Sequence, residues 1–365
     1  MRILFDCTNI TVGGGIQVAN SFLRYAFRST EIEYCFLLSN KVFESLNEKE
    51  KSDCNLKINV VTSNHYTLLP GHISMRRIRT IEAQFKPDVT FTLFGPAYWK
   101  SKAPHIVGFA RPHYILHHSP FYRIRKNRKL IRFMYFLEAV HNYLFRKNSD
   151  YLFVENESMV STLQKKYRKK VYYVPNTYNQ VFDNYVPVAE KKSDSVFRLL
   201  TISSDYPHKN LESIPRVATV LKQKYPDFRF RFIVTIKDDD ENVSTENINY
   251  IGSVTIEQCP DFYLNSDAMY LPTLLECFSA SYVEAMYMKV PILTSDLDFA
   301  RSICGEAARY FDPLNEENIA DTIYNLAHKV TDQKQLIDFG SERLNIFGSP
   351  EDRYNRFVSL FLKIK

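Results

Sequence analysis

Residues 271–286 read Leu271-Pro-Thr-Leu-Leu-Glu-Cys-Phe-Ser-Ala-Ser-Tyr-Val-Glu-Ala-Met286. This pattern predicts a buried strand, a turn and the first turns of a helix, with Glu276 before the helix and Glu284 inside it. A helix start attracts anions, because its first N–H groups are unpaired and its dipole is positive there. Two carboxylates beside that spot favour a ligand that carries both a diphosphate and hydroxyl groups, as a nucleotide-sugar does.

Short apolar runs alternate with helical segments along the whole chain, which is typical of a parallel sheet covered by helices. Ligands of such sheets bind beyond the carboxyl ends of the strands. The predicted strands are Ile3–Phe5, Tyr34–Leu38, Lys57–Val61, Asp88–Leu93, Ile106–Phe109, Tyr151–Val154, Tyr172–Val174, Phe197–Ser203, Arg229–Ile236, Ala268–Leu271 and Ile292–Thr294.

The apolar periodicity lapses around Asn179–Asp194, which predicts a linker there. A chain of 365 residues favours two domains over one. We therefore expect an α/β protein with two facing Rossmann-like domains, residues 1–182 and 195–349, with parallel sheets and an interdomain cleft. The last segment, residues 350–365, has helical apolar spacing and can pack back on the first domain.

The composition excludes several classes of protein. No stretch approaches the roughly 18 apolar residues that span a membrane. The apolar run at the N-terminus is interrupted by Asp6, which predicts a first strand and not a signal peptide. The six cysteines have no metal-like CxxC spacing, so reduced thiols and a cytoplasmic location are the simplest interpretation.

A second candidate segment, Ser203-Ser-Asp-Tyr-Pro-His-Lys-Asn-Leu211, joins a predicted strand to the predicted helix Leu211–Lys224. Lys209 stands near the entrance of this helix, where its ammonium group can meet phosphate oxygens. A charge-assisted hydrogen bond of this kind contributes about 1.5–3 kcal/mol. The alternative is an exposed loop lysine.

Both glutamates also have a structural alternative. Ser281-x-x-Glu284 fits a capping box, in which the acid satisfies an N–H at the helix end. The functional interpretation is that Glu284 grips ribose hydroxyls. Glu276 is either a solvated loop acid or, because it directly follows an apolar run, a site residue at the carboxyl end of a strand.

The stretch Gly13-Gly-Gly15 lies between the first predicted strand and a helix that begins near Ile16. Glycine lets a backbone approach a ligand closely or adopt positive φ. The spacing is not GxGxxG, so a dinucleotide site is poorly supported. A ligand role and a simple tight turn both remain open.

Arg111-Pro-His113 follows the predicted strand Ile106–Phe109, again at a carboxyl end. A histidine in this place can act as a general base or a hydrogen-bond donor. His117 and His118 compete for the same role, and a structural role is the alternative for each. The three histidines have no nearby carboxylate or cysteine that would complete a metal site.

The run Asp238-Asp-Asp240 can hold a divalent cation, but its flanking charges favour a solvated turn. We therefore predict no metal site and no resident cofactor.

Residues 121–148 combine many basic side chains with a single acid, Glu138. Aromatic and apolar side chains lie between the basic ones. Such a segment either lies on an anionic membrane surface or packs as an amphipathic helix on its own domain. Nucleic-acid binding is not expected, since no binding motif accompanies the charge. The basic residues are Arg123, Arg125, Lys126, Arg128, Lys129, Arg132, Arg146 and Lys147.

Together these residues resemble the family 4 glycosyltransferases, which have the GT-B fold of two facing Rossmann-like domains. Glu276-Cys-Phe-Ser-Ala280 resembles the family's Glu-Gly-Phe-Gly-Leu loop, and Glu284-Ala-Met286 matches its Glu-Ala-Met. The likeness continues through Val290-Pro-Ile-Leu-Thr-Ser-Asp296 and Gly305-Glu-Ala-Ala-Arg-Tyr-Phe-Asp-Pro313. Shorter matches are Val174-Pro-Asn176, Lys209-Asn-Leu211 and Gly14-Gly-Ile16.

The resemblance implies a role for each matching residue. Glu284 would bind the ribose, Glu276 would contact the transferred sugar, and Lys209 would hold the diphosphate. The backbone of Phe278, Ser279 and Ala280 would meet the sugar and phosphate, and His113 best matches the family's histidine near the sugar. Gly14 and Gly15 match its glycine loop. Three departures are Ser203-Ser204 in place of Gly-Arg, where Ser204 can donate instead, and Cys277 and Ser279 in place of glycines.

The expected activity is transfer of a sugar from a nucleoside diphosphate donor, as co-substrate, to a hydroxyl of a glycan or lipid-linked glycan, with retention. The implied setting is cell-surface polysaccharide or lipopolysaccharide synthesis in the cytoplasm or at the inner membrane face. The alternatives are a nucleotide-sugar epimerase of the same fold and a non-catalytic nucleotide-sugar-binding protein.

Overall fold

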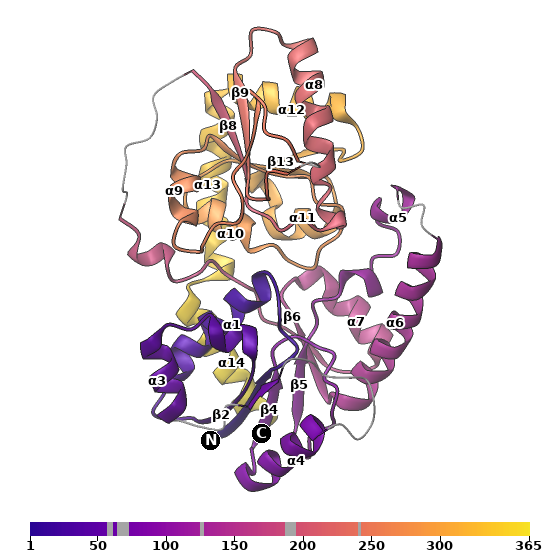
Figure 1. The fold of residues 1–365 in the computed structure, drawn as a ribbon, viewed down its shortest axis with the longest axis vertical. Coiled ribbons are helices and arrows are strands. Elements are labelled where there is room, and N and C mark those ends of the chain that lie inside the picture. Colours follow the sequence, from indigo (N-terminus) through magenta and orange to yellow (C-terminus); the bar gives the residue numbers. More distant parts are fainter. Residues whose placement is uncertain (57–60, 64–72, 125–127, 187–194, 240–241) are drawn as a thin grey trace. The chain divides into compact units, whose positions relative to one another are not determined.

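The computed structural model describes residues 1–365 except 57–60, 64–72, 125–127, 187–194 and 240–241. The chain forms two compact units, shown as ribbons in Figure 1. Unit 1 comprises residues 1–115, 126–175 and 349–365, and unit 2 comprises residues 116–125 and 176–348. Most of the predicted strand Lys57–Val61, part of the predicted linker, and Asp240 lie outside the described residues.

Unit 1 is built on a parallel sheet of seven strands in the order β3-β2-β1-β4-β5-β6-β7. The strands are β1 (Arg2–Cys7), β2 (Glu33–Ser39), β3 (Val61–Ser63), β4 (Val89–Thr92), β5 (His105–Gly108), β6 (Tyr151–Val154) and β7 (Val171–Tyr173). The helices are α1 (Gly14–Ala26), α2 (Asn40–Glu44), α3 (Glu48–Leu56), α4 (Ile73–Phe85), η1 (Pro112–Tyr114), α6 (Arg128–Asn148), η2 (Glu157–Met159), α7 (Val160–Tyr167) and α14 (Pro350–Ile364).

Helix α14 completes the core of unit 1, although it comes last in the sequence. Its start is stabilised by a capping box between Ser349 and Asp352. The ring of Phe357 lies 4.9 Å from that of Phe91 and 5.0 Å from that of Phe153. Helix α14, yellow in Figure 1, packs beside α1 in this unit. Burial of its apolar face accounts for the return of the chain to unit 1.

Unit 2 is built on a parallel sheet of six strands in the order β10-β9-β8-β11-β12-β13. The strands are β8 (Phe197–Thr201), β9 (Phe230–Val234), β10 (Ile248–Tyr250), β11 (Ala268–Leu271), β12 (Ile292–Ser295) and β13 (Ala308–Phe311). The helices are α5 (Phe121–Ile124), η3 (Phe182–Asn184), η4 (Pro207–Lys209), η5 (Leu211–Ser213), α8 (Ile214–Lys224), α9 (Cys259–Leu264), α10 (Ala280–Tyr287), α11 (Asp298–Cys304), η6 (Gly305–Ala307), α12 (Glu316–His328) and α13 (Val330–Phe347).

The unit boundaries differ from the expected ends at residues 182 and 195. Unit 2 begins again at Asn176, and it also contains residues 116–125, which the sequence places in the first domain. The reason is local bonding: the Ser119 hydroxyl donates to the Leu274 carbonyl at 2.5 Å. The ring of Phe121 also lies edge-on to that of His208, 6.5 Å away.

Two strands, β10 and β13, have no counterpart among the predicted ones. Strand β10 has only three residues, and exposed Asn249 interrupts its apolar pattern. In β13, half-buried Arg309 and Tyr310 dilute the apolar signal. Pairing with β9 and β12 organises these short segments, so tertiary context decides them.

Candidate functional site

The predicted acids lie where the strand order of unit 2 reverses. Strands β8 and β11 are neighbours, although β9 and β10 come between them in the sequence. Such a switch point leaves a crevice at the carboxyl ends of the strands, because successive connections diverge from it. The loops after the two strands, residues 202–210 and 272–279, are therefore well placed to form a ligand site.

Hydrogen bonds hold these two loops together. The Leu274 N–H donates to the His208 carbonyl at 2.8 Å. The Ser281 hydroxyl, in the first turn of α10, reaches the Ile202 carbonyl at 3.5 Å. The site is thus a bonded assembly of residues that lie about 70 positions apart in the sequence.

Lys209 and Glu276 form an ion pair between the Nζ and Oε1 atoms. Their side chains are only 11% and 14% exposed. Burial raises the pKa of Glu276, and the nearby Lys209 charge works against that rise. The second carboxylate oxygen, Oε2, is buried and has no hydrogen-bond partner among the described residues. A ligand hydroxyl in this place would satisfy it.

The backbone around Lys209 is shaped by Asn210. Asn210 adopts left-handed φ and ψ of 58° and 33°, a conformation that asparagine tolerates better than most residues. Its side-chain amide donates to the Pro313 carbonyl at 3.1 Å. This anchored turn ends η4 and holds Lys209 at the loop beside Glu276.

Glu284 is buried inside α10, with 6% of its surface exposed. Its Oε2 accepts a hydrogen bond from the Tyr263 hydroxyl at 3.0 Å. Burial raises the pKa of Glu284 to about 7, and the Tyr263 bond offsets part of that rise. Among the residues that the structure describes, no cation pairs with this carboxylate. Its environment thus favours the neutral acid until a donor-rich ligand arrives.

The capping-box alternative for Glu284 is wrong. Helix α10 has Ser279 as its N-cap, in an extended conformation and without a side-chain capping bond. Ser281 lies inside the first turn, and its hydroxyl donates to the Ile202 carbonyl in the loop after β8. The first N–H groups of α10 are therefore left without a side-chain acceptor from the N-cap, and they can receive an anion.

The three residues at the start of α10 are held by different contacts. The half-buried ring of Phe278 lies edge-on to that of Phe347, 5.9 Å away. Ser279 is buried, and Ala280 opens the helix. The helix start is thereby fixed against α13 in the same unit.

Ser204 lies on the same loop as Lys209 and is exposed. Its carbonyl accepts hydrogen bonds from the Tyr206 N–H at 2.9 Å and the Ser203 hydroxyl at 3.0 Å. The turn orders the backbone and leaves the Ser204 hydroxyl toward solvent. Its role as a phosphate donor stays a prediction.

Gly14, Gly15 and His113 belong to unit 1, at the carboxyl ends of β1 and β5. A Cβ added to Gly14 would meet no atom within 4 Å, whereas one on Gly15 would lie 3.1 Å from a methyl group of Ile10. Packing against Ile10 therefore explains why a glycine occupies position 15, but no such contact explains the glycine at position 14. His113 is half-buried in η1. The ligand roles of all three stay predictions.

His117 and His118 are exposed and lie in the part of unit 2 that carries Ser119. The ring of His117 lies 6.2 Å from that of Tyr122. The structure thus assigns these histidines to a different unit from His113.

The acidic run behaves as a turn in its described part. Asp238 accepts from the Ser244 N–H at 3.2 Å, and Asp239 accepts from the Asn242 N–H at 3.1 Å. Within the described ranges, no three His, Cys, Asp or Glu side chains gather as a possible metal ligand set.

Tyr263, Asn210 and Ser119 organise the site but were not among the predicted residues. Tyr263 lies in α9, 21 positions before its partner Glu284. No local spacing signals such a pair. Asn210 offers a weak signal, because an asparagine before a helix often marks a turn or cap.

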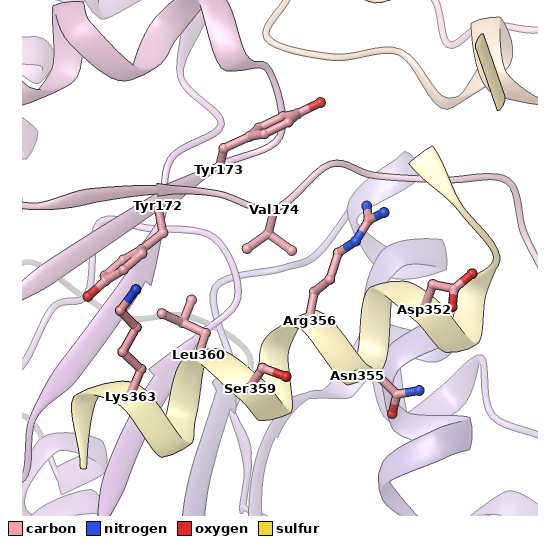
Figure 2. A pocket seen from close by; sticks show the side chains of 9 residues that line it. All are labelled: Tyr172, Tyr173, Val174, Asp352, Asn355, Arg356, Ser359, Leu360 and Lys363. Atoms are coloured by element: carbon pink, nitrogen blue, oxygen red, sulfur yellow. The ribbon is translucent and has the colours of Figure 1, made fainter. Parts of the chain in front are cut away.

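A cavity of about 500 Å³ lies elsewhere, in unit 1 between β7 and α14. Figure 2 shows Arg356, Leu360 and Lys363 of α14 facing Tyr172 and Val174. None of the predicted site residues lines it.

Comparison with known families identifies the part of the chain that carries the acids. Residues 187–343 match the family model described as "Glycosyl transferases group 1". The matched residues include Lys209, Glu276 and Glu284, together with the sheet switch point that positions them.

A curated relative is the O-antigen chain mannosyltransferase RfbU of Salmonella typhimurium (strain LT2). It is 21% identical over 149 residues, which are 38% of this chain. The match spans about two fifths, 40%, of the relative's own length.

Solved structures resemble the chain over nearly its whole length. A sucrose-phosphate synthase from Thermosynechococcus elongatus has a TM-score of 0.73 at 12% identity and covers 99% of this chain and 98% of its own. WaaG, a glycosyltransferase involved in lipopolysaccharide biosynthesis, has a TM-score of 0.70 at 11% identity and covers 97% and 99%. At such identities the likeness shows the fold alone, and the predicted GT-B type fold is confirmed.

Helix α6 displays an exposed aromatic stripe. Phe133, Tyr135, Phe136 and Tyr143 are 60%, 52%, 65% and 56% exposed. His141, Phe145 and Asn148 form its buried face. In the described part of the chain, no helix is long and apolar enough to cross a membrane.

Proposed function

We propose that the chain is a retaining family 4 glycosyltransferase that moves a hexose from a nucleoside diphosphate donor to an acceptor hydroxyl. The observation that carries this proposal is the buried pair of Lys209 and Glu276, with Glu276 Oε2 left unsatisfied, beside the open start of α10. These groups lie in residues 187–343, whose match to the group 1 family model supports the proposal. A nucleotide-sugar supplies a partner for each of them.

The diphosphate binds at the start of α10 and at Lys209. The N–H groups of the first turn and the helix dipole favour the anion, and the ammonium group adds a charge-assisted bond. Lys209 already contacts Glu276. When the donor binds, the Lys209 ammonium group therefore lies between the Glu276 carboxylate and a donor phosphate and contacts both. The pair thus keeps Lys209 oriented before the donor arrives.

Glu276 contacts the transferred sugar through Oε2, which accepts a sugar hydroxyl. Glu284 accepts the two ribose hydroxyls. Because Glu284 has a raised pKa and no cation beside it among the described residues, two hydroxyl donors stabilise its ionised form. Nucleotide binding therefore lowers the pKa of Glu284.

Transfer passes through an oxocarbenium-like transition state in which negative charge grows on the leaving diphosphate. Preorganised N–H groups and Lys209 stabilise that charge, each donor contributing roughly 3–4 kcal/mol. The proposed chemistry uses no resident cofactor or metal, so addition of EDTA should leave the transfer rate unchanged.

The acceptor is a glycan or a lipid-linked glycan in polysaccharide or lipopolysaccharide synthesis. The names of RfbU and WaaG support this setting. The exposed aromatic stripe of α6, with Arg132, Arg146 and Lys147 beside it, fits an anionic membrane surface that carries such an acceptor. The protein then works in the cytoplasm, at the inner membrane face.

Nucleotide binding and sugar transfer test the proposal together. UDP, GDP and ADP are screened for a rise in unfolding temperature, and the matching nucleotide-sugars, GDP-mannose included, are offered with a lipid-linked glycan extract. Glu276→Ala should bind the nucleotide and lose transfer by at least 100-fold. Glu257→Ala, at an exposed glutamate of the same unit, is the matched control.

Stabilisation by none of the three nucleotides would overturn the proposal, as would full transfer by Glu276→Ala. Release of an epimerised sugar without any acceptor would favour an epimerase. The anomeric configuration of the product, read by NMR, tests retention separately.

A further inference from the structure

Arg111 stands at the carboxyl end of the unit 1 sheet, two residues before His113. It follows β5 and forms the N-cap of η1, where its carbonyl accepts from the Tyr114 N–H at 3.0 Å. The side chain is half-buried. Arg111 therefore holds a permanent positive charge at the edge where a doubly wound unit binds its ligands.

The side chains around Arg111 are neutral at pH 7. The Tyr114 hydroxyl lies 2.7 Å from His141 Nδ1, and the Tyr98 hydroxyl lies 3.3 Å from Nε2. Burial raises the pKa of Tyr114 to about 12 and lowers the pKa of His141 to about 4. The Arg111 charge adds to the lowering for His141. None of the three rings can offset the guanidinium charge.

The carboxylates of this region have other partners. Glu138 pairs with Lys166 at 2.9 Å and accepts from the Asn142 amide at 3.2 Å. Glu155, directly after β6, pairs with Arg353 at 2.6 Å.

Asp6, in β1, accepts from the Trp99 indole at 3.0 Å and from the Thr8 N–H at 3.0 Å. Among the residues that the structure describes, no carboxylate pairs with Arg111. A half-buried charge without a counterion is costly, and an anionic ligand removes that cost.

We propose that Arg111 binds an oxyanion of the acceptor, a phosphate ester or a carboxylate, and so selects acceptors that carry one near the accepting hydroxyl. The planar guanidinium fork matches either group with two parallel hydrogen bonds. This proposal rests on the proposed function, because it assigns the acceptor to unit 1 while the donor occupies unit 2.

Anion binding to the full chain tests this site. Inorganic phosphate and D-glucuronate are titrated calorimetrically at low ionic strength, with the donor site filled by the nucleoside diphosphate that stabilises the protein. Wild type should bind one anion, and Arg111→Gln should bind it at least tenfold more weakly. Arg111→Lys, which keeps the charge but loses the fork, should fall between them.

Two controls make the result specific. Arg79→Gln removes an exposed arginine of α4 in the same unit and should bind as wild type does. A urea midpoint equal to that of wild type shows that Arg111→Gln is folded. Binding of phosphate alone assigns a phosphorylated acceptor, and binding of glucuronate alone assigns an acidic sugar.

Equal anion binding by wild type and Arg111→Gln, or no binding by wild type, would overturn the site. Equal losses in Arg111→Gln and Arg79→Gln would also overturn it, because they would reflect diffuse charge attraction. If no nucleoside diphosphate stabilises the protein but Arg111 still binds an anion, the proposed function fails and the acceptor role fails with it.

Discussion

The hydroxyl of Tyr263 donates to Glu284 Oε2 across 3.0 Å, and both side chains are buried. Among the described residues, no other side chain donates a hydrogen bond to the Glu284 carboxylate. One neutral hydroxyl cannot compensate a buried carboxylate, so the pKa of Glu284 rises to about 7. The arrangement costs stability, which is typical of residues kept for binding.

Replacing Glu284 with glutamine should stabilise the folded protein at neutral pH. In wild type, burial raises the pKa of Glu284 to about 7 from its ordinary value of 4.5, so the unfolded state ionises first as pH rises. Stability is therefore full below about pH 4.5 and falls through pH 7, by about 3 kcal/mol at most. Glu284→Gln should remove this fall, as measured by urea unfolding at pH 5 and pH 8.

The same variant should bind nucleoside diphosphates at least tenfold more weakly, since the amide is a poorer acceptor for ribose hydroxyls. Glu257→Gln is the exposed control and should change neither property. A variant that gains stability but keeps full nucleotide affinity would contradict the ribose role.

Lys209→Met should leave Glu276 as a buried carboxylate without its cation. Breaking a buried pair on one side costs about 3–5 kcal/mol, less what Glu276 regains by taking up a proton. The double variant Lys209→Met/Glu276→Gln should recover most of that stability, because it leaves no unpaired charge. In both the single and the double variant, the rate of sugar transfer should fall at least 100-fold. Unfolding in urea and transfer assays measure the two effects.

Comparing the single and double variants shows whether the Lys209–Glu276 pair serves stability alone or also sugar transfer. A double variant that regains transfer along with stability would show that the pair serves packing alone. A double variant as unstable as Lys209→Met would show that the pair is not the source of the cost.

Arg353→Met should destabilise unit 1 by about 3–5 kcal/mol. Arg353 is 4% exposed and pairs with Glu155, whose pKa is raised to about 6 by burial. Loss of the guanidinium leaves that acid buried and loosens α14 from the end of β6. Hydrogen exchange should rise in α14 and in the unit 1 strands.

Nucleotide affinity should stay within twofold in Arg353→Met, because the proposed donor residues lie in unit 2. Arg356→Met, at a half-exposed neighbour on the same helix, is the control and should leave exchange unchanged. Protection of α14 equal to that of wild type would contradict a stabilising role for the Arg353–Glu155 pair.

Phe133→Ser/Phe136→Ser should reduce binding to anionic vesicles at least tenfold, with no loss of stability. Both rings are more than half exposed, so their removal leaves no cavity. Co-sedimentation with vesicles of phosphatidylglycerol and phosphatidylethanolamine, at low and high salt, measures the effect. Leu362→Ser removes a side chain that is 64% exposed on α14 and is the control. If wild-type protein binds neutral and anionic vesicles equally, that result would argue against the membrane role.

Much of the fold could be predicted from the sequence. The predicted strands Ala268–Leu271 and Tyr151–Val154 coincide with β11 and β6, because both are short apolar runs bounded by polar residues. Strands β10 and β13 were not predicted, because their apolar pattern is weak and their strand conformation depends on pairing with neighbouring strands. The predicted first domain includes residues 116–125, whereas the structure assigns them to unit 2. The hydrogen bond from Ser119 to Leu274 accounts for that assignment.

Some features of the candidate site also follow from the sequence, and others follow only from the tertiary structure. The sequence by itself determined that Glu276 follows a strand and that Glu284 enters a helix, since apolar periodicity is a local property. Only the tertiary structure decided that Lys209 pairs with Glu276, that Tyr263 reaches Glu284 and that Arg111 has no acidic partner among the described residues. These relationships join residues far apart in the chain, and burial and charge pairing are set by packing, which local spacing does not encode.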